Sequence, residues 1–140
     1  MKIMLAVDGS KYTKRMLAYV AAHDEWLGGH QDYTVFTAVI AVPHAAATFV
    51  NADLVRSYHE ADAEAVFKPI RAFLEKQGIA AKYVQKVGHP AELIAKAAEK
   101  GRFDLLIMGS HGHGNLYNMV LGSVANKVLG GCTTPVLLVR

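Results

Sequence analysis

The chain has 140 residues, of which 52% are hydrophobic and 19% are charged, and its formal net charge at pH 7 is +3. This is enough apolar material for the core of one globular domain, so we expect a single domain over residues 1–140. The basic residues are scattered among acidic ones and no aromatic stripe accompanies them, so we expect no nucleic-acid partner.

The cysteine content and the hydropathy pattern indicate the cellular compartment in which the protein is expected. Cys132 is the only cysteine, so an intramolecular disulfide is excluded and a reducing compartment is favoured. The apolar run at the N-terminus ends at Asp8, which is too short for a secretory signal, and no segment is long enough to span a bilayer. We therefore expect a cytoplasmic protein without a membrane partner.

The beginning of the chain predicts a strand, a helix and a second strand. Residues 2–7 form a short apolar run that stops at an Asp-Gly-Ser turn, as a buried strand does. Apolar residues then recur at helical spacing as far as the glycine pair 28–29, which is expected to end the helix. Residues 33–42 are rich in β-branched and aromatic side chains and predict a second strand, which Pro43 ends.

The middle of the chain predicts a long helix, a third strand and another helix. The long helix is expected from about residue 48 to residue 77, and Pro69 inside it predicts a kink or a break into two helices. Residues 80–87 predict the third strand. Proline at position 90 and glycine at position 101 stand where the next helix is expected to begin and to end.

The end of the chain predicts a strand over residues 103–108, a glycine-rich loop, a helix from Ser123 and a last strand over residues 136–139. Ser123 is expected to cap that helix. Strands and helices therefore alternate along the whole chain, and right-handed crossovers place helices on both faces of a parallel sheet. The sequence predicts a doubly wound, Rossmann-like α/β fold with five strands in the order 3-2-1-4-5.

In such a fold, ligands bind beyond the carboxyl ends of the strands, where the strand order reverses. The order 3-2-1-4-5 puts this switch point between the first and fourth strands. The segment after the first strand reads AVDG, and the loop after the fourth strand carries three glycines and two histidines. Glycine N–H groups and a helix N-terminus there are suited to bind an anion, so these two segments are expected to line one site.

Other kinds of site are less well supported by the sequence. The sequence contains no P-loop, no complete dinucleotide-binding fingerprint and no nucleophile elbow. His111 and His113 could bind a metal ion, but a structural metal site needs four ligands and the only cysteine lies far along the chain. Histidines in a phosphate-binding turn are the simpler interpretation.

The spacing Gly109-x-x-Gly112, nine residues, then Gly122-Ser123 resembles the G-2x-G-9x-G-[ST] signature of the ATP-binding branch of the universal stress protein family. Four other stretches also resemble that family, and the resemblance covers essentially the whole chain; they read AVDGS, GHPAELI, DLLIMGSHG and PVLLV.

The resemblance implies a site for ATP. It implies that phosphates contact the signature residues, that Asp8 lies near the ribose and a phosphate-bound metal, and that the Val39 backbone contacts adenine. The implied metal is Mg²⁺ or Mn²⁺, carried mainly by phosphate oxygens, with no metal ligand or catalytic residue assigned to the protein. The implied nucleotide-binding residues are Ala6, Val7, Asp8, Val39, Met108, Gly109, Gly112, Gly122, Ser123 and Val124.

The function expected from these residues is an ATP-binding stress or signalling switch with at most slow ATP hydrolysis. One alternative is an ATP-hydrolysing or nucleotidyl-transferring enzyme, because HGHG resembles the H-x-G-H signature of such enzymes; that signature, however, follows their first strand. Another is a dimeric adaptor that binds AMP, a different nucleotide or none. The apolar last strand would be a sheet edge, so we expect a homodimer formed through residues 136–139.

Overall fold

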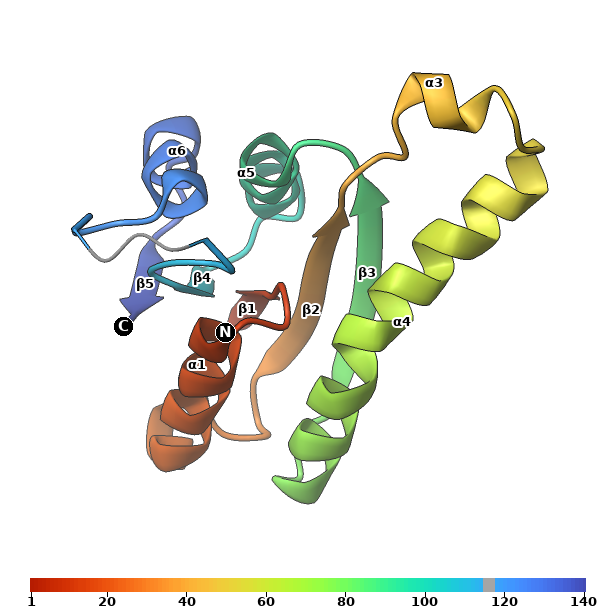
Figure 1. Ribbon diagram of the computed structural model, residues 1–140. Helices are drawn as coiled ribbons and strands as arrows, with labels where there is room; N and C mark the ends of the chain where they lie inside the picture. The colour runs from red at the N-terminus through yellow and green to blue at the C-terminus, as the bar shows by residue number, and fades with distance from the viewer. Residues whose placement is uncertain (115–117) are drawn as a thin grey trace.

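The computed structural model describes residues 1–114 and 118–140 (Figure 1). Its strands form one parallel sheet in the order β3-β2-β1-β4-β5, which confirms the predicted fold class and strand order. The strands are β1 (Lys2–Ala6), β2 (Asp32–Val39), β3 (Ala81–Val87), β4 (Leu105–Gly109) and β5 (Val136–Val139).

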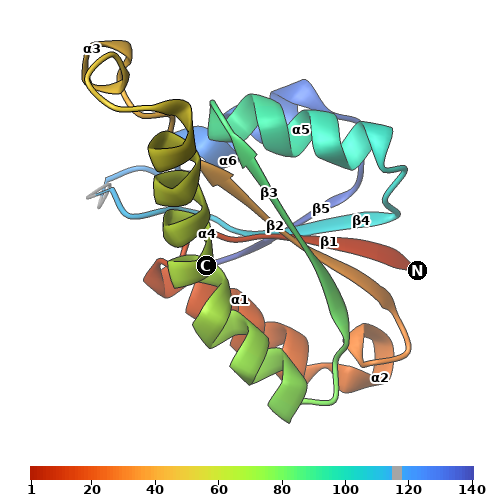
Figure 2. The same ribbon diagram turned by 90° about the vertical axis from the view of Figure 1, so that its right-hand side faces the viewer.

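Helices cover both faces of the sheet. They are α1 (Lys11–Ala22), α2 (Asp24–Leu27), α3 (His44–Ala47), α4 (Ala52–Lys76), α5 (Pro90–Lys100) and α6 (Ser123–Gly131). Figure 2 shows α1 and α4 on one side of the sheet and α5 and α6 on the other. None of the helices in the described ranges is both long and apolar enough to cross a membrane.

Two apolar cores follow from this arrangement, because successive side chains of a strand point to opposite faces. Ile3 and Leu5 pack with α1 and α4 in one core, whereas Met4 and Ala6 pack with α5 and α6 in the other. Both sets are nearly inaccessible to solvent. The central strand β1 is therefore apolar at every position after Lys2, which is why it reads as a continuous apolar run.

The switch point of the sheet lies between β1 and β4, as predicted. Ala6 of β1 pairs with Met108 of β4, so the carboxyl ends of the two strands lie next to each other. The chain leaves β1 through α1 on one face, and it leaves β4 through the glycine loop to α6 on the opposite face. The two connections diverge above the strand ends, which leaves room for a ligand between them.

The first helix is shorter than the sequence predicts. We expected one helix up to the glycine pair, but it ends at Ala22, and a separate short helix α2 follows. His23 is the cause: its ring Nδ1 lies 2.8 Å from the Tyr19 carbonyl, and its ring stacks on Tyr19. The side chain thus occupies the carbonyl that the His23 backbone N–H would bind in a continuous helix.

The connection between β2 and the long helix also differs from the prediction. Strand β2 ends at Val39 rather than at residue 42, and the short helix α3 was not predicted. Helix α4 begins at Ala52, because the Asn51 side chain accepts a 2.7 Å hydrogen bond from the Leu54 N–H and caps it. The beginning of α4 and all of α3 project beyond the carboxyl edge of the sheet (Figure 1).

The break expected at Pro69 is absent, since α4 is one continuous helix with Pro69 inside it. Proline lacks the N–H that would bind the carbonyl of Ala65. Both residues lie on the exposed side of α4, where water can bind that carbonyl. The neighbouring buried residues Phe67 and Ile70 hold the opposite side of the helix against the core.

The turn that leads into β5 is held by Glu99 at the end of α5. Its carboxylate accepts hydrogen bonds from the N–H and the hydroxyl of Thr133, the latter at 2.8 Å, and from the Thr134 N–H at 3.3 Å. These bonds, above all those from Thr133, lower the pKa of Glu99. The connection from α6 to the edge strand is therefore anchored to the neighbouring helix.

Candidate functional site

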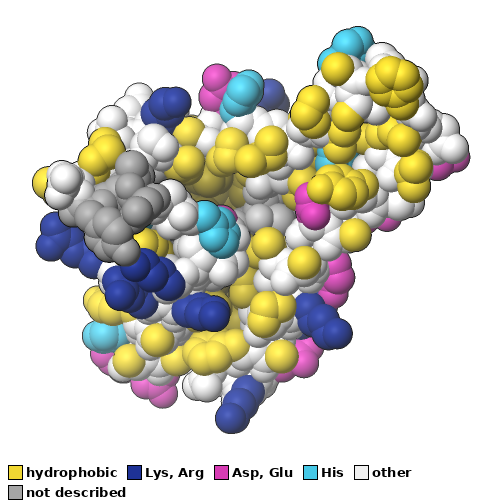
Figure 3. All heavy atoms as spheres, in the orientation of Figure 1, with side chains coloured by type: hydrophobic (Ala, Val, Ile, Leu, Met, Phe, Trp, Pro, Cys, Tyr) yellow, Lys and Arg dark blue, Asp and Glu magenta, His cyan; other side chains and the backbone are white. Residues whose placement is uncertain are grey.

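A cavity of about 530 Å³ lies at the carboxyl edge of the sheet, above the switch point. Its volume falls within the roughly 300–1,000 Å³ of small-molecule sites. Figure 3 shows this face of the molecule hollowed between the helices. All the residues that the sequence assigned to a nucleotide line it: Ala6, Val7, Asp8, Val39, Met108, Gly109, Gly112, Gly122, Ser123 and Val124.

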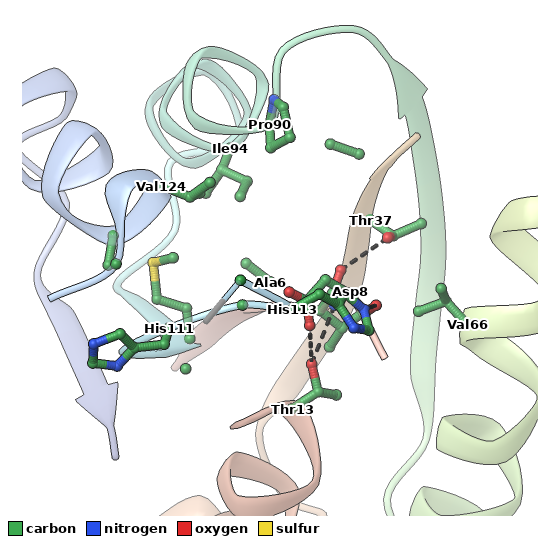
Figure 4. Close-up of a pocket in the computed structure, with 18 of the residues that line it drawn as sticks. Ala6, Asp8, Thr13, Thr37, Val66, Pro90, Ile94, His111, His113 and Val124 are labelled. Carbon is green, nitrogen blue, oxygen red and sulfur yellow. Dashed lines mark hydrogen bonds between the residues drawn. The ribbon is translucent and has the colours of Figure 1, made fainter. Parts of the chain in front are cut away.

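Asp8 is positioned by the turn between β1 and α1. Its Oδ1 accepts hydrogen bonds from the Ser10 N–H at 2.9 Å and from the Thr13 hydroxyl at 3.0 Å. Gly9 has a φ of +76°, a conformation that glycine adopts without strain and that lets the chain turn sharply. The carboxylate is thus held from one side by Oδ1, and Oδ2 is directed toward the glycine loop and the cavity (Figure 4).

The three signature glycines differ in what surrounds them. A Cβ on Gly109 would lie 2.6 Å from the Cβ of Tyr12, and one on Gly122 would lie 3.0 Å from the Cα of His111. Packing within the protein itself therefore explains why these two positions are glycine. A Cβ on Gly112 would instead lie 2.8 Å from Asp8 Oδ2, at the cavity. Of the three, Gly112 is the glycine whose added Cβ would meet the Asp8 carboxylate rather than packed atoms of the fold.

Helix α6 begins at the cavity, but Ser123 is not its cap, contrary to the prediction. Gly122 is the N-cap: its backbone is extended, and its carbonyl accepts the first helical hydrogen bond from Asn126 at 3.0 Å. The Gly122 N–H is bound to the Ser110 carbonyl at 2.8 Å, which sets where the helix starts. Ser123 is the exposed first residue, and residues 123–125 of the first turn line the cavity. The N–H groups of a first helical turn have no partner within the helix.

The two loop histidines hold the glycine loop in place. His113 Nε2 donates to the Asp8 carbonyl at 2.7 Å and ties the loop to the end of β1. His111 Nε2 donates to the Met119 carbonyl at 2.9 Å, and its Nδ1 lies 2.9 Å from the hydroxyl of buried Ser110. Within residues 1–114 and 118–140, no three His, Cys, Asp or Glu residues gather as a metal site would require.

The part of the cavity next to β2 and α5 is apolar. Val39 and Ile40 line it from the end of β2. Pro90 and Ile94 line it from the first turns of α5 (Figure 4). The Val39 carbonyl already accepts the Gly88 N–H at 2.9 Å within the sheet, and its second lone pair remains available. Such a surface is suited to pack against a flat apolar group.

Sequence reasoning did not identify several lining residues, namely Thr13, Thr37, Ile40, Asp62, Val66, Pro90 and Ile94. Pro90 and Ile94 stand four residues apart on one face of α5, but that spacing also describes a residue facing the core. Asp62 and Val66 belong to α4, far in sequence from every motif. Thr13 carried the one available signal, because a hydroxyl five residues after an Asp-Gly turn suits a bond to that carboxylate.

The charges of the cavity are unevenly distributed. The lining residues include two carboxylates, Asp8 and Asp62, and no lysine or arginine among those the structure describes. The donors that could bind an anion here are therefore backbone N–H groups, in the glycine loop and at the N-terminus of α6. The cavity thus has an end near α6 whose chemistry is suited to an anion, and a wall at α4 that carries Asp62.

A doubly wound parallel sheet with a cavity at its switch point defines an α/β protein of the kind that binds ligands between two strand-to-helix loops. Residues 1–140 match the universal stress protein family. The chain belongs to the universal stress protein family.

Two sequence relatives differ in how much of their length is matched. The "Universal stress protein in QAH/OAS sulfhydrylase 3'region" of Thermus aquaticus is 34% identical over 139 residues, which cover 99% of this chain and 97% of the relative. Universal stress protein MJ0577 of Methanocaldococcus jannaschii is 44% identical over 71 residues, which cover 51% of this chain and 44% of that relative. The second match thus spans less than half of the relative's length.

Solved structures share the fold. That of MJ0577 has a TM-score of 0.81 at 28% identity and covers 99% of this chain and 94% of its own. An Arabidopsis thaliana family member with AMP bound has a TM-score of 0.70 at 16% identity, and the match covers 99% of this chain and 90% of that one. An Archaeoglobus fulgidus member in complex with dAMP has a TM-score of 0.66 at 19% identity, and the match covers 100% of this chain and 98% of that one. At the latter identities the likeness concerns the fold alone.

Proposed function

We propose that the cavity binds ATP and that the protein acts as a nucleotide-dependent switch in a stress or signalling response. The observation that carries the proposal is that the glycine loop and the N-terminus of α6 face the Asp8 carboxylate across one cavity. The family membership and the AMP- and dAMP-bound relatives support an adenine nucleotide. The spacing of Gly109, Gly112 and Gly122-Ser123 favours ATP among these nucleotides.

In this proposal the phosphates lie against the end of the cavity near α6. The first turn of α6 and the loop N–H groups donate to phosphate oxygens, and the dipole of a helix adds about 0.3–1 kcal/mol per charge. Asp8 Oδ2 suits a divalent cation, Mg²⁺ or Mn²⁺, because Oδ1 holds the carboxylate in place and Oδ2 faces the same space. Phosphate oxygens would provide most of the remaining ligands of that cation.

The direct test is thermal unfolding with and without nucleotide. ATP with Mg²⁺ at a hundred times its Kd is expected to raise the free energy of unfolding by about 2.7 kcal/mol, because the ligand binds the folded state only. GTP is the matched control for base recognition at the apolar part of the cavity. The absence of any stabilisation by ATP, ADP or AMP would refute nucleotide binding at this site.

We expect any ATP hydrolysis to be slow, below the roughly 10 s⁻¹ of a median enzyme. Among the lining residues that the structure describes, none is a lysine or arginine that would stabilise charge on a transferred phosphoryl group. Turnover is measured by release of inorganic phosphate, with the Gly112→Val protein purified in parallel to reveal contaminating ATPase. Sustained turnover above that value in the wild type alone would favour an enzyme over a switch.

The same proposal includes a homodimer formed through β5, which is an edge of the sheet. A dimeric adaptor that holds AMP instead of ATP is the second candidate, and the AMP-bound relative is the observation that favours it. Mass spectrometry of the ligand released from the denatured protein distinguishes the two.

A further inference from the structure

Asp62 is a charged residue of the cavity for which no motif accounts. It lies on α4, and Val66, one helical turn later, also lines the cavity. A Cβ on Gly9 would lie 3.6 Å from Cγ2 of Val66, so this part of α4 packs directly against the turn that carries Asp8. Because residues four apart share a face of a helix, Asp62 lies one turn above this contact, toward the projecting end of α4.

Asp62 has no partner among the residues that the structure describes. Other acidic residues of α4 form ion pairs along the helix: Asp53 lies 3.7 Å from Arg56, and Glu64 lies 2.7 Å from Arg71. No ion pair or side-chain hydrogen bond is found for Asp62 within the described ranges. It is exposed at the wall of the cavity with its acceptor oxygens available to a ligand.

The chemistry of a carboxylate restricts what Asp62 can recognise. An ionised carboxylate only accepts hydrogen bonds, and it repels phosphate. A nucleotide whose phosphates lie at the N-terminus of α6 therefore places its nucleoside part toward Asp62. Figure 4 shows Asp8 and Val66 on the side of the cavity away from Val124 and His111. The donors of the nucleoside nearest its phosphates are the vicinal hydroxyls of the ribose.

We propose that Asp62 accepts hydrogen bonds from the ribose hydroxyls of the bound nucleotide and makes the site selective for ribonucleotides over 2′-deoxyribonucleotides. This inference rests on the proposed nucleotide-binding function and adds a residue that determines specificity. A carboxylate that binds the 2′-hydroxyl has a precedent in the acidic residue of dinucleotide-binding folds, although that residue follows a different strand. In this chain the residue comes from the helix that covers the edge of the cavity.

The test compares ATP with 2′-deoxyATP by isothermal titration calorimetry on the wild type and on Asp62→Ala. The wild type is expected to bind ATP about tenfold more tightly than 2′-deoxyATP, the effect of one hydrogen bond to a charged group. In Asp62→Ala the ratio of the two affinities is expected to fall to about one. Removing a negative charge changes the affinity for both triphosphates alike, so the ratio isolates the hydrogen bond.

Two variants serve as controls. Glu60→Ala removes a negative charge from the same helix at an exposed position that does not line the cavity, so the ratio is expected to stay that of the wild type. Asp62→Asn keeps one acceptor oxygen without the charge and is expected to retain part of the selectivity.

Other results would overturn the inference in distinguishable ways. Equal affinity of the wild type for both nucleotides, or an equal loss for both in Asp62→Ala, would reject ribose recognition while nucleotide binding stands. A loss of affinity in Asp62→Ala that occurs only with Mg²⁺ would show that the carboxylate binds the cation. That result would also reject ribose recognition. Failure of the wild type to bind either nucleotide would refute the proposed function itself.

Discussion

Replacing Gly112 with valine is expected to weaken ATP binding at least tenfold, about 1.4 kcal/mol, while the protein remains folded. The new Cβ would lie 2.8 Å from Asp8 Oδ2, so the carboxylate must move and the added methyl groups would enter the space assigned to the phosphates. The closest atom is the end of a side chain rather than backbone, so the fold can adapt. Affinity is measured by isothermal titration calorimetry and folding by thermal unfolding.

Two other glycines make this experiment specific. A Cβ on Gly130, within α6, would meet no atom within 4 Å, so Gly130→Val is expected to leave ATP affinity unchanged. Gly109→Val is expected to destabilise the fold by about 1–3 kcal/mol, because its Cβ would lie 2.6 Å from the Cβ of Tyr12. Unchanged ATP affinity in folded Gly112→Val would show that the loop does not hold the phosphates.

The second large effect is expected at the edge strand, where we propose that two copies of β5 pair across a two-fold axis. The Leu106 N–H binds the Pro135 carbonyl at 2.9 Å and the Ser110 N–H binds the Val139 carbonyl at 2.8 Å. Because polar groups alternate along a strand, the N–H and C=O of Leu138 point away from β4, to the open edge. In a dimer the partner strand would satisfy them.

Leu138→Pro removes the outward N–H donor without removing a bond to β4, so it is expected to shift the protein from dimer to monomer. Light scattering after gel filtration at micromolar concentration is expected to give about twice the 15.2 kDa chain mass for the wild type and about that mass for the variant. Leu138→Ala keeps the N–H and controls for loss of the side chain. A wild type that runs as a monomer at that concentration would reject the proposed dimer.

Much of the fold could be predicted because its signals are local. Ile3 to Ala6 and Leu106 to Met108 are buried by helices on both faces, so each strand is apolar throughout. Pro90 and Gly101 stand where α5 begins and where its cap lies. The spacing from Gly109 to Gly122 brings both ends of the glycine loop to one cavity. Hydrophobic periodicity and turn residues of this kind depend only on residues that lie close to one another in the sequence.

The misplaced boundaries have a different origin. His23 ends α1 because its ring binds the Tyr19 carbonyl, and helical periodicity gives no warning of such competition. Pro69 is tolerated within α4 because the side of the helix that faces water is the one that loses the hydrogen bond. Gly122 rather than Ser123 caps α6, because the Gly122 N–H is bound to the Ser110 carbonyl across the loop.

The sequence by itself determined the alternation of strands and helices and the glycine loop with Asp8, because each follows from patterns within a few residues. The strand order was an expectation from the type of fold, and the structure confirmed it. Only the tertiary structure decided that Asp62 and Val66 form a wall of the same cavity, because α4 reaches it by packing against the turn at Gly9. It also decided that Gly109 is required by Tyr12 whereas Gly112 faces the carboxylate. Such contacts join residues far apart in the chain, and their distances are set by the packing of whole elements.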